Sequence, residues 1–432
     1  MIKYFQVHEN GSTLKTEIMA GITTFLATAY IIIVNPIILS RAGMPFSGLV
    51  TATILVAFFS SVAMGLYAKN PIVVAPGMGI NAFFTFTLVL GMGVPWATAL
   101  GAVFWSGIVF LLLSIFNIRT KIVAAIPASL QKAIACGIGL FIALIGLSNG
   151  GLIQASSATM ITSAPLSPKV ITFMIGLLVT AYLVIRKVQG GLFYGIILTS
   201  LMTIPLGRLW GQDILISYKG LYAPPDFSLL FSLDIAGSLK WTFVPVIFSM
   251  LFTDLFDSLS TFVGVAQAGN LLDSDGRPRN IKQSLIVDGF STALSGLLGS
   301  SSGTSFIESA AGISQGGRTG LVAVVAGLLF LPFLFLSPLL SVIPALATAP
   351  VLVIVGAFMM KPIVAINWND LEEAFPAFLG MILIPLSYSI THGIIWGFLS
   401  YAAIKIMRGK IKEVPPFLHI INILAVLALV LK

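Results

Sequence analysis

Four acidic residues lie within long apolar stretches of the chain, where ionisable side chains are rare: Asp254, Asp257, Asp288 and Glu308. No lysine or arginine lies in the middle of the same stretches. If these stretches cross a membrane, an ionised side chain at the bilayer centre costs roughly 2.5–3.5 kcal/mol even on the milder insertion scale. Four such residues therefore predict a polar site inside the membrane.

Asp254 and Asp257 are three residues apart in the segment LFTDLFDSLSTFVG, so they share one face of a helix. The hydroxyl side chains of Thr253, Ser258 and Thr261 lie on or near the same face. We interpret this face as the lining of a polar chamber. For Asp257, helix capping or a hydrogen bond between helices is the alternative.

Glu308 follows an irregular Gly/Ser stretch and falls in the first turns of a short predicted helix. Burial favours the neutral acid, whereas the free N–H groups and the dipole of a helix N-terminus favour the carboxylate. A group balanced between these effects can bind and release a proton, as coupled transport requires. Glu308, Asp254, Asp257 and Asp288 are our candidates for proton coupling. Asp288, near the start of its own apolar stretch, could instead hydrogen-bond the irregular backbone beside it.

The composition indicates a protein whose solvent is lipid. Of 432 residues, 57% are hydrophobic and 9% are charged, whereas soluble domains are about one quarter charged. The net charge of +8 comes from basic residues scattered singly through loops, which argues against nucleic-acid binding. The single cysteine, Cys136, excludes a disulfide within the chain and a cysteine-based metal cluster. We expect no cofactor and no metal.

Apolar runs predict an all-helical membrane protein with fourteen transmembrane spans. The predicted spans are 17–39, 47–68, 72–91, 95–117, 129–147, 169–185, 190–207, 239–266, 282–300, 303–316, 319–341, 344–361, 373–389 and 391–407. A last apolar stretch, 417–431, is short for a span and could lie in the interface or cross as a fifteenth.

The loop charges predict the orientation. With the N-terminus inside, seventeen basic residues fall in inner segments and five in outer ones, with Lys432 undecided. This bias follows the positive-inside rule. We therefore expect a multi-pass protein of the plasma (inner) membrane with a cytoplasmic N-terminus.

Seven spans on each side of the long loop 208–238 predict two inverted repeats, residues 1–230 and 231–432, because an odd number of spans reverses the second half. The third span, PIVVAPGMGINAFFTFTLVL, and the tenth, SSSGTSFIESAAGISQGG, both begin irregularly and continue with about twelve residues that could be helical. Twelve residues rise only ~18 Å, so both spans are predicted to be broken around a site near the midplane. The alternative is that Gly77, Gly79 and Gly303 only allow close helix packing.

Carboxylates in a cavity repel anions and accept hydrogen bonds from N–H groups. Phe83, Phe84 and Phe256, near the same segments, offer flat apolar surfaces, although in a chain with 31 phenylalanines a given one more often faces lipid or the core. Together these features favour a planar heterocycle with N–H donors.

Four segments of the sequence resemble the AzgA-like purine permeases, a branch of the nucleobase–cation symporter family. The segments are TEIMAGITTFLATAYIIIVNPIIL, APGMGINAFF (75–84), TDLFDSLSTFVGVAQAGNLLD (253–273) and VDGFSTALSGLLGSSSGTSFIESAAGISQGGRTGL (287–321). The resemblance covers nearly the whole chain. It implies fourteen spans in two inverted repeats, with four spans of each half in a core domain and three in a gate domain.

The resemblance also implies which polar positions are essential: Asn81, Asp254, Asp257 and Glu308. The related ascorbate and xanthine/uracil branch has asparagine directly after the acidic or Gln residue of the tenth span. Ser309 stands there in this chain, which argues against uracil, xanthine or ascorbate as the main substrate.

Our hypothesis is the uptake of adenine, guanine or hypoxanthine with protons, or with sodium as the alternative ion. Glu308 and Asp254 would accept N–H bonds from the base or carry the proton, and Asn81 would bond the ring edge. Phe83 or Phe256 would stack, and groups near Ser305 would complete the site. Besides the purine, the ion and the lipid bilayer, a second copy in a homodimer is a candidate partner.

Two other functional classes fit the sequence less well. An anion or dicarboxylate transporter with the same fold needs a basic or uncharged tenth-span site, and Glu308 argues against it. A membrane aspartyl protease needs its two aspartates on different helices, whereas Asp254 and Asp257 share one.

Overall fold

The computed structural model describes residues 2–116, 126–156, 159–209, 220–269, 271–272, 278–415, 418–419 and 422. Most of the last apolar stretch, 417–431, lies outside the described residues, and so does its predicted position in or across the membrane.

Eight helical segments of the described chain are long and apolar enough to cross a membrane. They are formed by α2 (Leu14–Thr28) with α3 (Ile31–Ser40), α4 (Phe46–Ala63) with η1 (Met64–Ala68), α6 (Trp96–Ile115), α8 (Ala128–Asn149), α9 (Pro168–Ile185), η4 (Trp241–Phe243) with α11 (Val244–Gly269), α16 (Ala345–Phe358) with η7 (Lys361–Ala365), and α18 (Ile390–Met407). Each falls within or around one of the predicted spans. The chain is thus a mostly helical, multi-pass membrane protein.

The other predicted spans contain helices that are shorter or less apolar. They include α5 (Met78–Ala82) with η2 (Phe83–Gly91), α10 (Gly191–Leu209), α12 (Ile281–Leu298), α13 (Ala310–Ser314), α14 (Leu321–Phe330), α15 (Ser337–Leu340) and α17 (Leu371–Ser387). Outside them lie α1 (Ile2–Phe5) and a hairpin of β2 (Ile153–Ser156) and β3 (Met160–Ser163).

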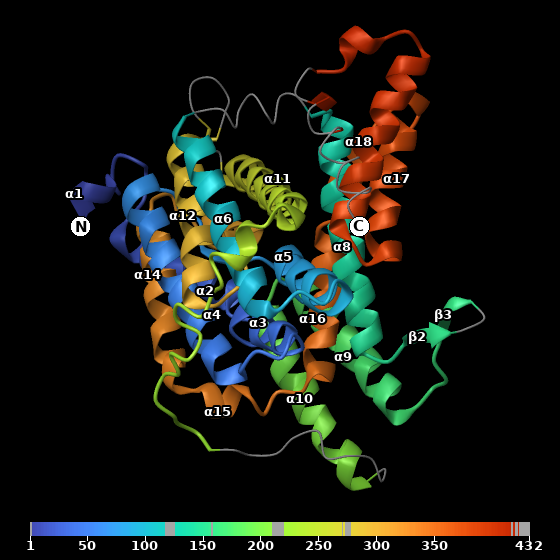
Figure 1. Ribbon diagram of the computed structural model, residues 1–432. Coiled ribbons are helices and arrows are strands. Elements are labelled where there is room, and N and C mark those ends of the chain that lie inside the picture. The colour runs from blue at the N-terminus through green and yellow to red at the C-terminus, as the bar shows by residue number, and fades with distance from the viewer. Residues whose placement is uncertain are drawn as a thin grey trace.

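The helices pack in two groups (Figure 1). The first contains α2, α3, α4, α6, α11, α12, α13 and α14, and the second contains α8, α9, α10, α16, α17 and α18. Glycines bring the helices of each group together: a Cβ on Gly107 of α6 would overlap the backbone of Ala293 on α12, and a Cβ on Gly356 of α16 would overlap the carbonyl of Gly139 on α8. Such small-residue contacts are typical of helix packing in membranes.

The third and tenth predicted spans are broken, as expected, and they meet each other. β1 (Val74–Pro76) pairs antiparallel with β4 (Gly303–Ser305), with Ala75 opposite Thr304. Two further backbone bonds extend the pairing, from Gly77 N to Ser302 O at 2.9 Å and from Phe306 N to Val73 O at 2.9 Å. A helical part follows each strand: α5 and η2 after β1, and η5 (Ile307–Ser309) with α13 after β4.

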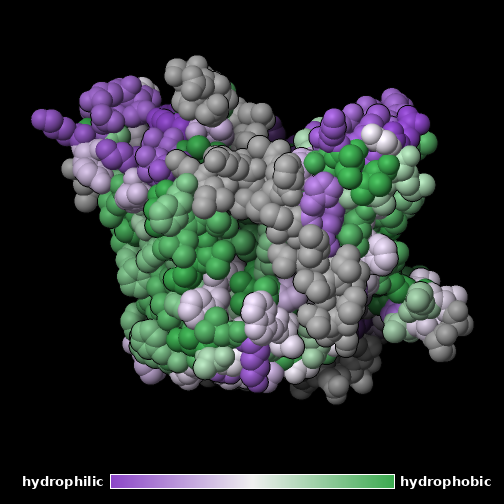
Figure 2. Space-filling view, turned by 45° about the horizontal axis from the view of Figure 1, so that its top comes forward, coloured by the Kyte–Doolittle hydropathy of each residue, from purple (hydrophilic) through white to green (hydrophobic). Residues whose placement is uncertain are grey.

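The surface agrees with a lipid environment. Hydrophobic side chains cover much of the visible side of the molecule, whereas hydrophilic ones gather toward the top (Figure 2). Leu178 of α9 and Leu201 of α10 are 65% and 56% exposed, which is costly in water and normal in lipid.

The packing of β4 against α12 leaves no room for a side chain at position 303, because a Cβ there would overlap Ser291 Oγ. We expect Gly303→Ala to force Ser291 or β4 to shift, at a cost of about 1–3 kcal/mol. The melting temperature of the purified protein should fall. Gly380→Ala on α17 is the matched control, because the nearest atom to its new Cβ is 3.4 Å away. Equal melting temperatures for the two variants would show that β4 is not tightly packed.

Candidate functional site

A small cavity of about 60 Å³ lies where the broken tenth span meets α11, and we call it the central cavity. Tyr30, between α2 and α3, and Val355 and Met359, at the end of α16, line it as well. Its lining residues are Tyr30, Met78, Gly79, Asp257, Thr261, Thr304, Ser305, Phe306, Ile307, Glu308, Val355 and Met359. The cavity therefore lies between the two helix groups.

Two of the four acidic residues singled out in the sequence, Asp257 and Glu308, line the central cavity. The Thr304 side chain hydrogen-bonds to Asp257, so a residue of β4 contacts an acid of α11. Thr261, one helical turn beyond Asp257, adds a hydroxyl to the same wall. The predicted polar face of α11 thus points toward the broken tenth span.

The other two acids, Asp254 and Asp288, are fully buried and bind the same strand region from α11 and α12. Ser305 Oγ donates to Asp288 Oδ1 at 2.9 Å. Thr292 Oγ1 contacts both Asp254 Oδ2 and the carbonyl oxygen of Gly303. Neither acid lines the cavity, but each connects to β4, which forms one of its walls.

Asn81, the predicted contact for the ring edge of the base, lies away from the central cavity. It is fully buried, does not line the central cavity, and its Nδ2 donates to Asn35 Oδ1 at 3.1 Å. Asn35 also donates to Thr53 and Ser300, so the two asparagines join α3, α4, α5 and the loop before β4. Among the described residues, Asn81 Oδ1 has no hydrogen-bond partner.

The structure describes one of the two predicted aromatic side chains, that of Phe83. Phe83 is 1% exposed and packs in the hydrophobic core, and it does not line the cavity. The side chain of Phe256 lies outside the described part of the structure. Phe306 lines the cavity instead, and its ring lies 6.4 Å from that of Tyr30. Phe306 sits within the SSSGTSFIESAAG motif, but only the fold shows which phenylalanine reaches the site.

Tyr30 is the second residue that the sequence did not reveal. Its hydroxyl donates to Glu308 Oε1 at 2.7 Å, across 278 residues of chain. A tyrosine within an apolar run such as ATAYIIIV gives no signal of this contact, because tyrosine is also common at membrane interfaces.

A larger cleft of about 430 Å³, here called the Lys187 cleft, lies on the other side of Glu308. Thr23 and Ala27 of α2, the turn between α9 and α10, and the α13 region line it, together with Lys187 and Lys361. Glu308 lines both this cleft and the central cavity. Glu308 therefore stands between the two.

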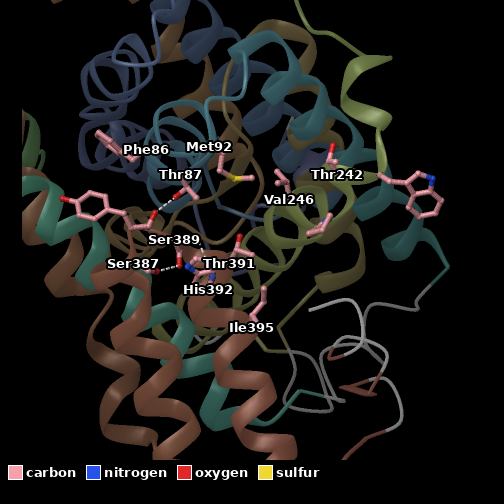
Figure 3. A pocket seen from close by; sticks show the side chains of 14 residues that line it. Phe86, Thr87, Met92, Thr242, Val246, Ser387, Ser389, Thr391, His392 and Ile395 are labelled. Carbon is pink, nitrogen blue, oxygen red and sulfur yellow. Dashed lines mark hydrogen bonds between the residues drawn. The ribbon is translucent and has the colours of Figure 1, made fainter. Parts of the chain in front are cut away.

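A third space of about 390 Å³, the His392 cleft, is lined by the end of η2, the start of α11 and the turn between α17 and α18 (Figure 3). None of the four acidic residues lines it. Thr87 Oγ1 donates to the carbonyl oxygen of Tyr388 at 2.6 Å, and the Tyr388 ring packs edge-on against Phe141. The Thr87 bond joins η2 to the second helix group at the His392 cleft, whereas the Tyr388–Phe141 contact lies within that group.

Residues 15–395 match a permease family, which covers both broken spans and all four acidic residues. The chain is 42% identical to the adenine permease AdeP of Escherichia coli, over 99% of this chain and 95% of that protein. It is 38% identical to the guanine/hypoxanthine permease PbuO of Bacillus subtilis, over 97% of this chain and 98% of that protein. The resemblance to purine permeases noted in the sequence is thereby confirmed.

Solved structures share the fold at low sequence identity. The transmembrane domain of the cyanobacterial bicarbonate transporter BicA matches with a TM-score of 0.68 and 16% identity, over 89% of this chain and 97% of that one. The murine Slc26a9 anion transporter in its inward-facing state matches with a TM-score of 0.63 and 10% identity, over 93% of this chain and 69% of that one. The family match and the near full-length relatives show that the chain belongs to the permease family. It is a membrane transport protein rather than an enzyme.

Proposed function

We propose that this permease imports purine nucleobases: adenine, guanine or hypoxanthine. The observation that carries the proposal is the central cavity, in which two carboxylates, four hydroxyls and two aromatic rings meet at a broken span. The relatives named as adenine and guanine/hypoxanthine permeases support the same substrate class.

The chemistry of the cavity fits a neutral base with N–H donors. Glu308 and Asp257 accept hydrogen bonds, and the hydroxyls of Thr261 and Thr304 can donate or accept. The Phe306 ring offers a stacking surface, in place of the predicted Phe83. One of the solved structures with this fold is a bicarbonate transporter, but the two carboxylates in the cavity of this chain would repel an anion such as bicarbonate.

Proton symport is supported by the contacts of Asp254. The Thr292 hydroxyl has one hydrogen and two acceptors in reach, Asp254 Oδ2 and the Gly303 carbonyl. If Asp254 carries a proton, it can donate to Thr292, which then donates to Gly303. If Asp254 is ionised, Thr292 turns toward the carboxylate and Gly303 loses that bond. A proton on Asp254 would thus change a hydrogen bond to β4, which forms one wall of the cavity.

We further propose fourteen spans in two inverted repeats, residues 1–230 and 231–432. The two clefts support this arrangement. The Lys187 cleft is lined mainly by the first, tenth and sixth-to-seventh predicted spans, with Phe358 and Lys361 of the twelfth added, and the His392 cleft by the eighth, third and thirteenth-to-fourteenth. Corresponding spans differ by seven places in the chain, as two inverted seven-span repeats require. The antiparallel pairing of β1 with β4 is also expected for elements related by a two-fold axis.

Alternating access would then consist of the second helix group, the gate, moving against the first, the core. With the N-terminus cytoplasmic, the Lys187 cleft opens to the cytoplasm and the His392 cleft to the outside. Because Glu308 lines the Lys187 cleft and Thr87 is bonded to Tyr388, this conformation would be open inward.

Glu308→Gln tests the proposed role of the acid. The substitution keeps the size of the side chain but replaces a carboxylate with an amide, which cannot accept a proton at neutral pH. We expect cells that express this variant to lose accumulation of radiolabelled adenine, guanine and hypoxanthine, with the protein still in the membrane. Glu9→Gln, at an exposed residue near the N-terminus, is the control. Unchanged uptake by Glu308→Gln would refute the assignment.

Thr87→Val tests the closure of the outer path, because it removes the hydroxyl bonded to Tyr388. Thr87→Ser keeps that hydroxyl and is the control. The reporter is a cysteine at Thr261 in a Cys136→Ser background, labelled in intact cells with a membrane-impermeant maleimide.

One lost hydrogen bond of about 1 kcal/mol should speed labelling roughly fivefold in Thr87→Val relative to Thr87→Ser. Equal labelling rates in the two variants would mean that the Thr87–Tyr388 bond does not hold the path closed.

A further inference from the structure

Tyr30 lines the central cavity, and its hydroxyl bonds another residue of the cavity lining. The residue lies in the break between α2 and α3, and its side chain is 1% exposed. A buried tyrosine hydroxyl usually finds a hydrogen-bond partner. Here that partner is Glu308 Oε1 at 2.7 Å, and the ring packs beside Phe306 in the cavity wall.

The hydrogen bond from Tyr30 fixes the side chain of Glu308, which lies next to two different spaces. Glu308 stands in η5, a single 3-10 turn, and lines both the central cavity and the Lys187 cleft. That cleft carries the side chains of Lys187 and Lys361, whose positive charges attract a carboxylate. A hydroxyl that holds Oε1 opposes rotation of the carboxylate into the cleft.

We propose that Tyr30 is a positioning residue for the substrate: its hydroxyl holds Glu308 Oε1 and thereby keeps Oε2 directed at the base in the central cavity. This inference rests on the proposed function, since it assigns the acid that binds the base. The ring of Tyr30, with that of Phe306, also forms part of the apolar wall.

The hydroxyl can serve both protonation states of Glu308. It donates to the carboxylate, and it can accept a hydrogen bond from the neutral acid, because a phenolic oxygen is both donor and acceptor. Tyr30 can therefore keep the side chain in place whether or not a proton is bound. A phenylalanine keeps the ring and its packing but loses both options.

The test is purine uptake by Tyr30→Phe, with KM and maximal rate measured separately. A hydrogen bond to a charged group is stronger than one between neutral groups. We therefore expect its loss to raise KM about tenfold for adenine, or for whichever purine the wild type prefers. The maximal rate should stay within about twofold of wild type, because the translocating helices are untouched. The melting temperature of the purified variant reports any loss of packing.

Tyr401→Phe is the matched control. Tyr401 is a buried tyrosine of α18 that lines neither the central cavity nor either of the two clefts. A KM of Tyr30→Phe within twofold of wild type overturns the inference, whatever the maximal rate. A tenfold rise in KM that Tyr401→Phe reproduces overturns it as well. If the wild-type protein itself takes up no purine, the proposed function fails before Tyr30 is tested.

Discussion

An irregular backbone inside a membrane must find all of its hydrogen bonds within the protein, because the lipid offers none. In this permease β1 and β4 meet that requirement for each other, through an antiparallel pairing of residues 74–76 with 303–305. The pairing ties the third predicted span to the tenth, so one half of the chain supports the break in the other. The half-helices that follow the strands can then begin in the interior of the protein, where a site needs them.

The acidic residues are arranged around this pairing. Asp257 and Glu308 face the central cavity, and Asp254 and Asp288 bind the strand region from behind through Thr292 and Ser305. A change in the charge of Asp254, Asp257 or Asp288 would therefore act on the same three residues of β4. This arrangement gives the proposed coupling a physical route: protonation alters hydrogen bonds to β4, and β4 forms a wall of the cavity.

The sequence predicts those parts of the site that depend on local signals. Glycine, proline and serine runs indicated both broken spans, and ionisable residues in apolar stretches indicated the acids. It did not predict contacts between distant segments: Tyr30 meets Glu308 across 278 residues, and Phe306 rather than Phe83 reaches the cavity. Asn81, an implied ligand, bonds Asn35 away from the cavity, because the direction of a side chain on a half-helix depends on how its neighbours pack. The roles assigned to the four acids and the number of spans stay predictions.

Uptake into proteoliposomes tests the central claim most directly. Purified protein is reconstituted, and adenine, guanine, hypoxanthine, uracil and bicarbonate are compared as competitors, with a proton gradient or a sodium gradient imposed in separate experiments. We predict that only the purine bases compete and that the proton gradient alone drives accumulation above the outside concentration. Competition by bicarbonate or uracil equal to that by the purines, or accumulation driven only by sodium, would contradict this account.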